Sequence, residues 1–293
     1  MLTARRGVTL VELLVTVVVG GIALSLVAGI ALRQQRVFAD MANLAAVTGQ
    51  LRETSAILPI DLRSAASAAG DIREARDTSI ELRATIASAV VCDTTASGLL
   101  LAPDYTGSAS AITAGDSAWL FDARDSGDVW KPRRIMAATT APSGQCAALG
   151  PTLSDSGRNV TRIALTLDSA PPRDWTGAPM RVTRVLRYSL YRSSDGSWNL
   201  GERDWNPATS RFNTIQPVSG PFLSAASGGL VFRYADSTGA PLATPVVDPR
   251  RIALIRFDLR GQTRQAPRVL TTRAVSAPRV DSTSTLVLLR NRR

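Results

Sequence analysis

A run of apolar residues from Val8 to Leu32 constrains the fold of this chain more than any other feature, and it contains one charged side chain, Glu12. An α-helix rises about 1.5 Å per residue, so this run would be about 37 Å long as a helix. That length is sufficient to cross the hydrocarbon core of a bilayer, which is about 30 Å thick. Because an ionised carboxylate in such a segment is costly and usually functional, Glu12 needs an explanation.

The residues around the apolar run bear on its orientation and its fate. Arg5 and Arg6 precede the run and favour a cytoplasmic N-terminus, whereas Arg33 and Arg36 follow it and weaken that bias. A cleaved secretory signal has an apolar core of only about 7–15 residues, so this run is too long for one. An uncleaved signal anchor fits the length but leaves Glu12 unexplained.

A third interpretation explains the carboxylate. Residues 5–14 read RRGVTLVELL, and this stretch resembles the type III signal of type IV prepilins and pseudopilins, although Val8 stands where that family usually has Phe. The resemblance implies that a prepilin peptidase cuts between Gly7 and Val8 on the cytoplasmic side and methylates the new N-terminus at Val8. The apolar helix would remain in the mature subunit, with Glu12 as its fifth residue.

The resemblance also implies a role for Glu12 in assembly. In the family this Glu is thought to meet the N-terminal amine of a neighbouring subunit as the helix leaves the membrane for the filament. A buried charge costs much less free energy when it is paired, so the pairing would set the register of one subunit on the next. The alternative is that Glu12 interacts only with the positive end of its own helix dipole.

Beyond Arg33 the pattern changes from apolar to amphipathic, with apolar residues at steps of three, four or seven. These residues are Val37, Met41, Leu44, Val47, Leu51 and Leu58. They predict one helix of about 50 residues that leaves the membrane and lies on a head, with Pro59 kinking or ending it and Asp61–Ser64 adding a turn. Four segments follow: a leader peptide at 1–7, a transmembrane and filament-core helix at 8–32, an amphipathic helix at 33–67 and a β-rich periplasmic head at 68–293.

The head is predicted to consist of short strands rich in Val, Ile, Leu and Thr, separated by Gly, Asp, Ser and Pro. The candidate strands are Ser79–Cys92, Gly98–Ala102, Ala118–Asp122, Arg134–Thr139, Val160–Leu167, Met180–Arg192, Ser197–Glu202, Gly229–Ala235, Arg251–Leu259 and Ser284–Arg290. The sequence SSDG after Arg192 predicts a hairpin turn at Asp195-Gly196. The expected fold class is therefore α+β, with a long helix on an antiparallel sheet, as in pilins.

Composition argues against several classes of function. The chain has no His, which removes the usual general base and the commonest metal ligand, and we expect neither an enzyme, a metal site nor a cofactor. Its two cysteines, Cys92 and Cys146, would pair in an oxidising periplasm, and the alternative is two buried free thiols. Nearly all basic residues are Arg, which resembles the codon bias of a GC-rich genome, so the net charge of +10 is poor evidence for nucleic-acid binding.

Two short motifs have simple structural interpretations. Gly115-Asp116-Ser117 is similar to the nucleophile block of GDS-type esterases, but those enzymes need a His base, so we predict a turn before a strand. Asp122, Asp125 and Asp128 do not have the spacing of an EF-hand loop, which favours a solvated acidic loop over a calcium site.

The C-terminal part adds to the resemblance. Minor pilins and pseudopilins of the PilW and GspJ-like type often end in a strand that finishes in Leu-Arg-Asn, as at Leu289-Arg290-Asn291. They also share Asp61-Leu62-Arg63 and an aromatic strand such as Val185–Arg192. The resemblance implies a minor subunit of a type IV pilus or a type II secretion pseudopilus, near the tip, anchored in the inner membrane. Its partners would be prepilin peptidase, other pilin subunits and the inner-membrane assembly platform.

Two other functions remain open. The first is a DNA-binding competence pilin that contacts phosphates through the arginines of residues 250–293, although Phe257 is the only aromatic residue there. The second is an anchored hydrolase with Ser117 as nucleophile, which the absence of His disfavours.

Overall fold

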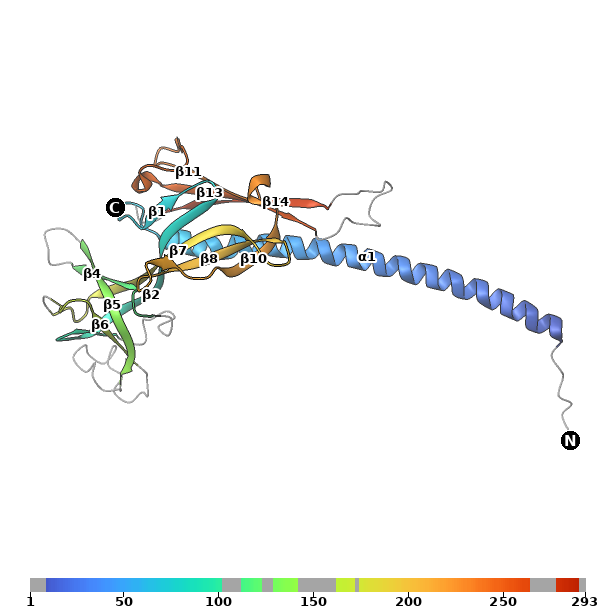
Figure 1. Cartoon of the computed structure of the whole chain (residues 1–293), viewed down its shortest axis with the longest axis horizontal. Coiled ribbons are helices and arrows are strands. Elements are labelled where there is room, and N and C mark those ends of the chain that lie inside the picture. The colour runs from blue at the N-terminus through green and yellow to red at the C-terminus, as the bar shows by residue number, and fades with distance from the viewer. Residues whose placement is uncertain are drawn as a thin grey trace, which may run out of the picture.

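The structure, a computed structural model, describes residues 9–101, 112–122, 129–141, 162–171, 174–263 and 278–289. One long helix, α1, extends from a head of β-strands, and the N-terminal end of α1 lies far from the head (Figure 1). The predicted α+β fold, a helix on an antiparallel sheet, is therefore confirmed. Gly7, Val8 and Cys146 lie outside the described residues.

The helix α1 (Leu10–Ser64) has 55 residues and is continuous. Asp40 is the first of its residues that the head buries. Further along, four apolar side chains enter the core of the head: Val47, Leu51, Leu58 and Leu62. The helix thus has two parts, one that the head covers and one, before Asp40, that no other described part of the chain covers.

Pro59 lies inside α1 and does not end it, since the helix continues for one more turn to Ser64. A proline in a helix lacks the N–H that would bond the carbonyl four residues earlier. The ring of Pro59 is buried, and the neighbouring side chains of Leu58 and Leu62 are buried on either side of it. This packing stabilises the last turn despite the missing hydrogen bond. The helix ends three residues before the expected boundary at residue 67.

The described strands, all in antiparallel pairs, form one hydrogen-bonded sheet. They are β1 (Ile72–Ala75), β2 (Ser79–Thr95), β3 (Gly98–Leu101), β4 (Ser117–Asp122), β5 (Val129–Ala141), β6 (Arg162–Leu167), β7 (Pro179–Arg192), β8 (Trp198–Asn206), β9 (Arg211–Phe212), β10 (Gln216–Phe222), β11 (Leu230–Ala235), β12 (Pro241–Leu242), β13 (Leu254–Gln262) and β14 (Val280–Leu288). In the described ranges, two short 3-10 helices, η4 (Ala225–Ser227) and η5 (Pro249–Arg251), lie between the strands.

Part of this sheet closes on itself. The strands β2, β3, β6, β5, β4 and β7 pair in that order, and β7 also pairs with β2. We call this closed ring the barrel lobe. Its interior is filled by buried apolar side chains that include Val91, Leu101, Leu120, Ile135, Leu165 and Val182. A closed ring leaves no open edge between its first and last strands, which removes one site of unwanted strand pairing.

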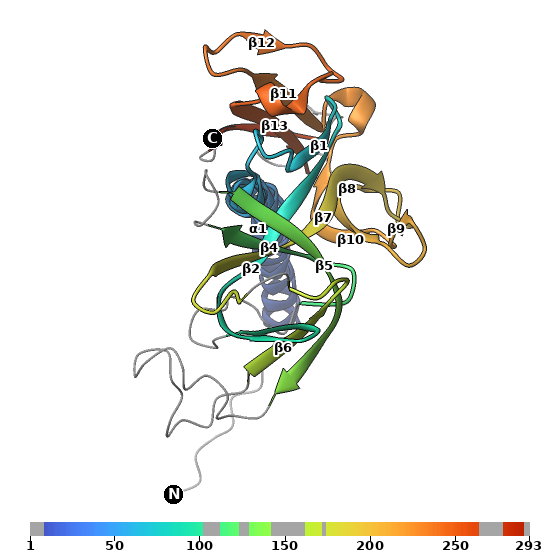
Figure 2. The same cartoon turned by 90° about the vertical axis from the view of Figure 1, so that its left-hand side faces the viewer.

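The remaining strands form a second part of the head, which we call the helix lobe. It comprises β1, β8, β9, β10, β11, β12, β13 and β14, together with the parts of β2 and β7 that lie next to them. In the end-on view of Figure 2, β11 and β13 lie on one side of α1, and β5 and β6 of the barrel lobe lie on the other. The core of the helix lobe joins α1 to aromatic side chains of the sheet: Tyr188, Phe222, Phe232, Tyr234 and Phe257.

The two lobes share the long strands β2 and β7. These strands pair from Ser79↔Ser189 to Val90↔Pro179, with a shift of register between Thr85 and Ala87. Such a β-bulge bends a strand and increases its twist. The bulge therefore lies where β2 passes from the helix lobe into the barrel lobe.

The ten candidate strands all coincide with or overlap observed strands, and the β7–β8 hairpin turns at Asp195-Gly196, with Gly196 at a φ of +84°. The candidate strands do not include β1, β9, β10 and β12. Three of these strands have two to four residues, too few for a pattern of alternation. The strand β10 reads QPVSGPF, and its two prolines and its glycine argue against a strand.

Leu58 and Ile60 provide a matched test of the contact between α1 and the head. Leu58 is 1% exposed and Ile60 is 67% exposed on the same turn. Leu58→Ala should lower the free energy of unfolding by about 2–5 kcal/mol, because it leaves a cavity in the core. Ile60→Ala should change it by less than about 0.5 kcal/mol. Chemical denaturation of the full chain in detergent measures both; equal losses would contradict the observed packing.

Candidate functional site: the N-terminal helix and the polar clusters of the head

The start of α1 is organised by Thr9 and Glu12. The backbone N–H of Glu12 donates to Thr9 Oγ1 at 3.3 Å, and the backbone N–H of Thr9 donates to Glu12 Oε2 at 3.2 Å. This is a capping box, which satisfies N–H groups that have no partner within the helix. The spacing Thr-x-x-Glu could have been recognised in the sequence as this motif. In a single chain, Glu12 is thus engaged locally, and its role in subunit register stays a prediction.

The first part of α1 presents apolar side chains in every direction. Within the described residues, α1 contains one segment that is long and apolar enough to cross a membrane, and the head covers none of it. Water disfavours such an apolar surface, so lipid or another protein must cover it. The apolar run that supplies this segment ends at Leu32, before Asp40, where the head begins to cover the helix.

Cys92 is fully buried on β2, where it packs with Leu100 of β3. Because Cys146 lies outside the described residues, the pairing of the two cysteines stays a prediction.

The Gly115-Asp116-Ser117 motif forms a turn, as predicted, and Ser117 begins β4. Asp116 accepts the backbone N–H of Thr113 at 2.8 Å and binds Arg184 Nε and Nη2 at 2.7 and 2.8 Å. The side chain of Asp116 therefore fixes the turn to β7.

Of the three aspartates of the acidic loop, Asp122 forms an ion pair with Lys131, while Asp125 and Asp128 lie outside the described residues. The described residues contain no group of three side chains that could hold a metal ion.

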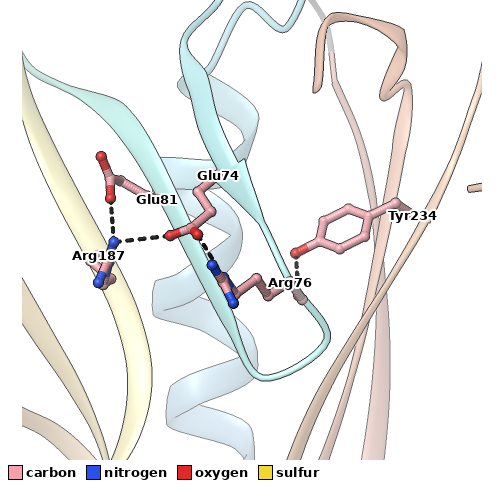
Figure 3. Close-up of polar contacts among 5 residues, drawn as sticks. All are labelled: Glu74, Arg76, Glu81, Arg187 and Tyr234. Carbon is pink, nitrogen blue, oxygen red and sulfur yellow. Dashed lines mark hydrogen bonds and ion pairs between the residues drawn. The ribbon is translucent and has the colours of Figure 1, made fainter. Parts of the chain in front are cut away.

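A network of charged side chains joins β1, β2 and β7 (Figure 3). Arg187 Nη2 lies 2.9 Å from Glu74 Oε2 and 2.8 Å from Glu81 Oε2, and Arg76 Nε lies 2.6 Å from Glu74 Oε1. The Tyr234 hydroxyl donates to the carbonyl of Arg76 at 2.8 Å, which adds β11 to the network. The effect of this network is to connect strands of the helix lobe.

A second cluster attaches the end of α1 to the sheet. The Tyr188 hydroxyl on β7 lies 2.5 Å from Asp61 Oδ2 in the last turn of α1, and 2.9 Å from Glu202 Oε2 on β8. Tyr188 and Glu202 are opposite each other in the β7–β8 pairing. The structure thus brings together two of the stretches on which the PilW and GspJ-like resemblance rests, Asp61-Leu62-Arg63 and Val185–Arg192.

Burial perturbs all three groups of this cluster. It raises the pKa of Asp61 and of Glu202, and the hydrogen bond from Tyr188 only partly offsets that effect. The negative charges of Asp61 and Asp204 raise the pKa of Glu202 further, whereas Arg184 lowers it. Burial and the two neighbouring carboxylates raise the pKa of the Tyr188 hydroxyl.

A third cluster lies on the outer side of the barrel lobe. The guanidinium of Arg181 lies 5.3 Å from the ring centre of Trp119 and 5.5 Å from that of Trp130, and its Nη1 is 2.9 Å from the fully buried Asp71. These are the distances of cation–π contacts. The arginine and the two rings are therefore engaged with one another.

Comparison with known proteins identifies the N-terminal segment. Residues 2–28 match the family model of the prokaryotic N-terminal methylation motif. This match supports the type IV pilin and pseudopilin family, and it indicates a type IV pilin-like substrate of prepilin peptidase. The apolar first part of α1 and the motif together fit a membrane-anchored pilin. No curated protein and no solved structure matches the chain significantly.

Arg187 provides a test of the charged network in Figure 3. Arg187→Met should lower the free energy of unfolding by about 1–3 kcal/mol, because it leaves Glu74 and the nearly buried Glu81 close together without their shared cation. Arg192→Met, on the exposed end of the same strand, should change it by less than about 0.5 kcal/mol. The measurement is thermal unfolding of the full chain in detergent; no difference between the variants would show that the network is not stabilising.

Proposed function

We propose that this chain is a minor pilin or pseudopilin, which prepilin peptidase processes between Gly7 and Val8 and which then enters a type IV pilus or a type II secretion pseudopilus. The observation that carries the proposal is the methylation motif at residues 2–28, continuous with a helix whose apolar first part no other described part of the chain covers. A subunit of this kind needs its helix twice, first as a membrane anchor and then as a packing surface.

The length of α1 and its division into two parts support a helix that lies first in the membrane and then against other subunits. At about 1.5 Å per residue the helix is about 80 Å long, much longer than a bilayer is thick. Its exposed apolar part can lie in lipid before assembly and against the helices of other subunits afterwards. Its second part belongs to the core of the head and stays there in both environments.

The minor-subunit role and a position near the tip rest on the resemblance to the PilW and GspJ-like branch and on the size of the head. A major pilin is usually about half as long as this chain. The barrel lobe lies at the end of the molecule away from the N-terminus of α1 (Figure 1), so a subunit at the end of a filament would present this lobe outward. Partners would be other pilin subunits and the inner-membrane assembly platform, with the head in the periplasm. We propose no enzymatic activity.

A DNA-binding competence pilin is the second candidate. Its basic surface would come from the arginines of residues 250–293, but Arg256 and Arg233 both interact with Asp258, which neutralises part of that charge. Reversal of the exposed Arg250 and Arg279 to Glu separates the two functions. Loss of DNA binding with intact filaments would favour the competence pilin.

Processing is tested directly by the mass of the intact protein. In membranes that contain a prepilin peptidase, the mature chain should begin at Val8 and carry a methyl group on its amine. Gly7→Ala should block cleavage and leave the chain beginning at Met1. A wild-type chain that keeps Met1, or one that is cut after the apolar run, would contradict the proposal.

The role of Glu12 can be separated from its capping box, because Thr9 forms the other half of that box. Glu12→Ala should abolish incorporation into sheared filaments while cleavage continues, since the carboxylate that pairs with the neighbouring amine is lost. Thr9→Ala breaks the capping box but keeps the carboxylate, and it should assemble nearly as well as the wild type. Equal assembly defects in the two variants would assign Glu12 to capping alone.

A further inference from the structure

The cluster of Asp61, Tyr188 and Glu202 contains more acceptors than a neutral tyrosine can satisfy. A phenol has a single O–H, and an ionised carboxylate can only accept hydrogen bonds. Tyr188 can therefore donate either to Asp61 Oδ2 or to Glu202 Oε2, yet its oxygen lies within hydrogen-bond distance of both. The second contact needs a proton on one of the two carboxyl groups, which then donates to the phenol oxygen.

The surroundings of the cluster favour the retention of such a proton. Tyr188 is 1% exposed, and burial raises the pKa of both carboxyl groups. The charged neighbours are Asp204 on β8, which disfavours a second negative charge, and Arg184 on β7, which favours it. Arg184, however, is bound through Nε and Nη2 to Asp116, and that bond directs its charge to another carboxylate.

We propose that Asp61, Tyr188 and Glu202 form a proton-dependent latch, in which one proton shared by the two carboxyl groups holds the last turn of α1 on the β7–β8 hairpin. Asp61 comes from the helix, and the other two groups come from the sheet. When the proton is present, each short contact contains a hydrogen. When it leaves, two carboxylates compete for one O–H and repel each other across the joint between helix and head.

The direction of the pH dependence follows from the raised pKa values. A carboxyl group that binds its proton more tightly in the folded than in the unfolded chain makes the folded chain the better proton binder. Its contribution to stability is present at low pH and is lost as pH rises from the ordinary values of 3.8 and 4.5 through the raised folded values. The latch is therefore closed in acid and loosens as the pH rises.

The composition of the chain makes this dependence measurable. The chain has no His, so between about pH 5.5 and about pH 8 the ordinary titrating group is the N-terminal amine, with a pKa of about 7.7–8.0. Loss of stability over this range then reports carboxyl groups with raised pKa values. The first turn of α1 is distant from the joint (Figure 1), and the amine that precedes it is the same in every variant.

The substitution Glu202→Gln should make the shared proton unnecessary. The side-chain N–H of Gln can donate to the phenol oxygen while the Tyr188 hydroxyl donates to Asp61. In the wild-type full chain in detergent, the equilibrium constant for unfolding should rise about tenfold for each unit by which the pKa is raised, which lowers Tm by about 2–3 °C. Glu202→Gln should lose this slope and be more stable than the wild type at about pH 8. Glu53→Gln, an exposed carboxyl on the same helix, should keep the wild-type slope.

A second measurement locates the effect and remains informative if the amide variant does not fold. Hydrogen exchange of the α1 amides around Asp61, corrected for the intrinsic effect of pH, should show opening that increases with pH in the wild type. The infrared band of a protonated carboxylic acid should persist to a higher pH in the wild type than in Asp61→Asn. A band that disappears at the same pH in both proteins, or a Glu202→Gln variant with the wild-type pH slope, would overturn the latch.

Discussion

The structure depends on one constraint: a single continuous helix must satisfy two different environments. Its second part is held by the head through Val47, Leu51, Leu58 and Leu62, whereas its first part has no covering in the described chain. Burial of apolar side chains is the dominant favourable contribution to folding, so the first part can only be stabilised by something outside the fold. A type IV pilin-like subunit meets this condition, because lipid and then neighbouring helices supply the covering.

Much of this could be predicted from the sequence, and what was missed has physical reasons. The apolar run and the strands of Val, Ile, Leu and Thr were recognisable because one local pattern determined each of them. The strand β10 was not, because its prolines and glycine are tolerated only through its neighbours β8 and β13. The sequence left open whether Pro59 kinks or ends the helix and allowed a further turn at Asp61–Ser64; continuation of α1 to Ser64 depends on packing that the local sequence does not encode.

The candidate site likewise has a part that could be predicted from the sequence and a part that could not. The processing motif is local and was recognised, and so was the turn at Asp116. The polar clusters were not, because their members are far apart in the sequence: Asp61 and Tyr188 are separated by 127 residues, and Glu81 and Arg187 by 106. Only the fold brings such groups together, and a single sequence gives no indication of which Asp meets which Tyr.

The position of the Asp61–Tyr188–Glu202 cluster makes the joint between helix and head relevant to both lobes. Tyr188 lies on β7, and β7 continues from the helix lobe into the barrel lobe, where it pairs with β4. The strand is fixed along its length, by Glu81 at Arg187, by Asp116 at Arg184 and by Asp71 at Arg181. The last turn of α1 therefore contacts a strand that both lobes share. Because Val47, Leu51, Leu58 and Leu62 hold α1 in the core of the helix lobe, opening of the cluster would loosen the last turn of α1 against β7 and leave the rest of that packing in place.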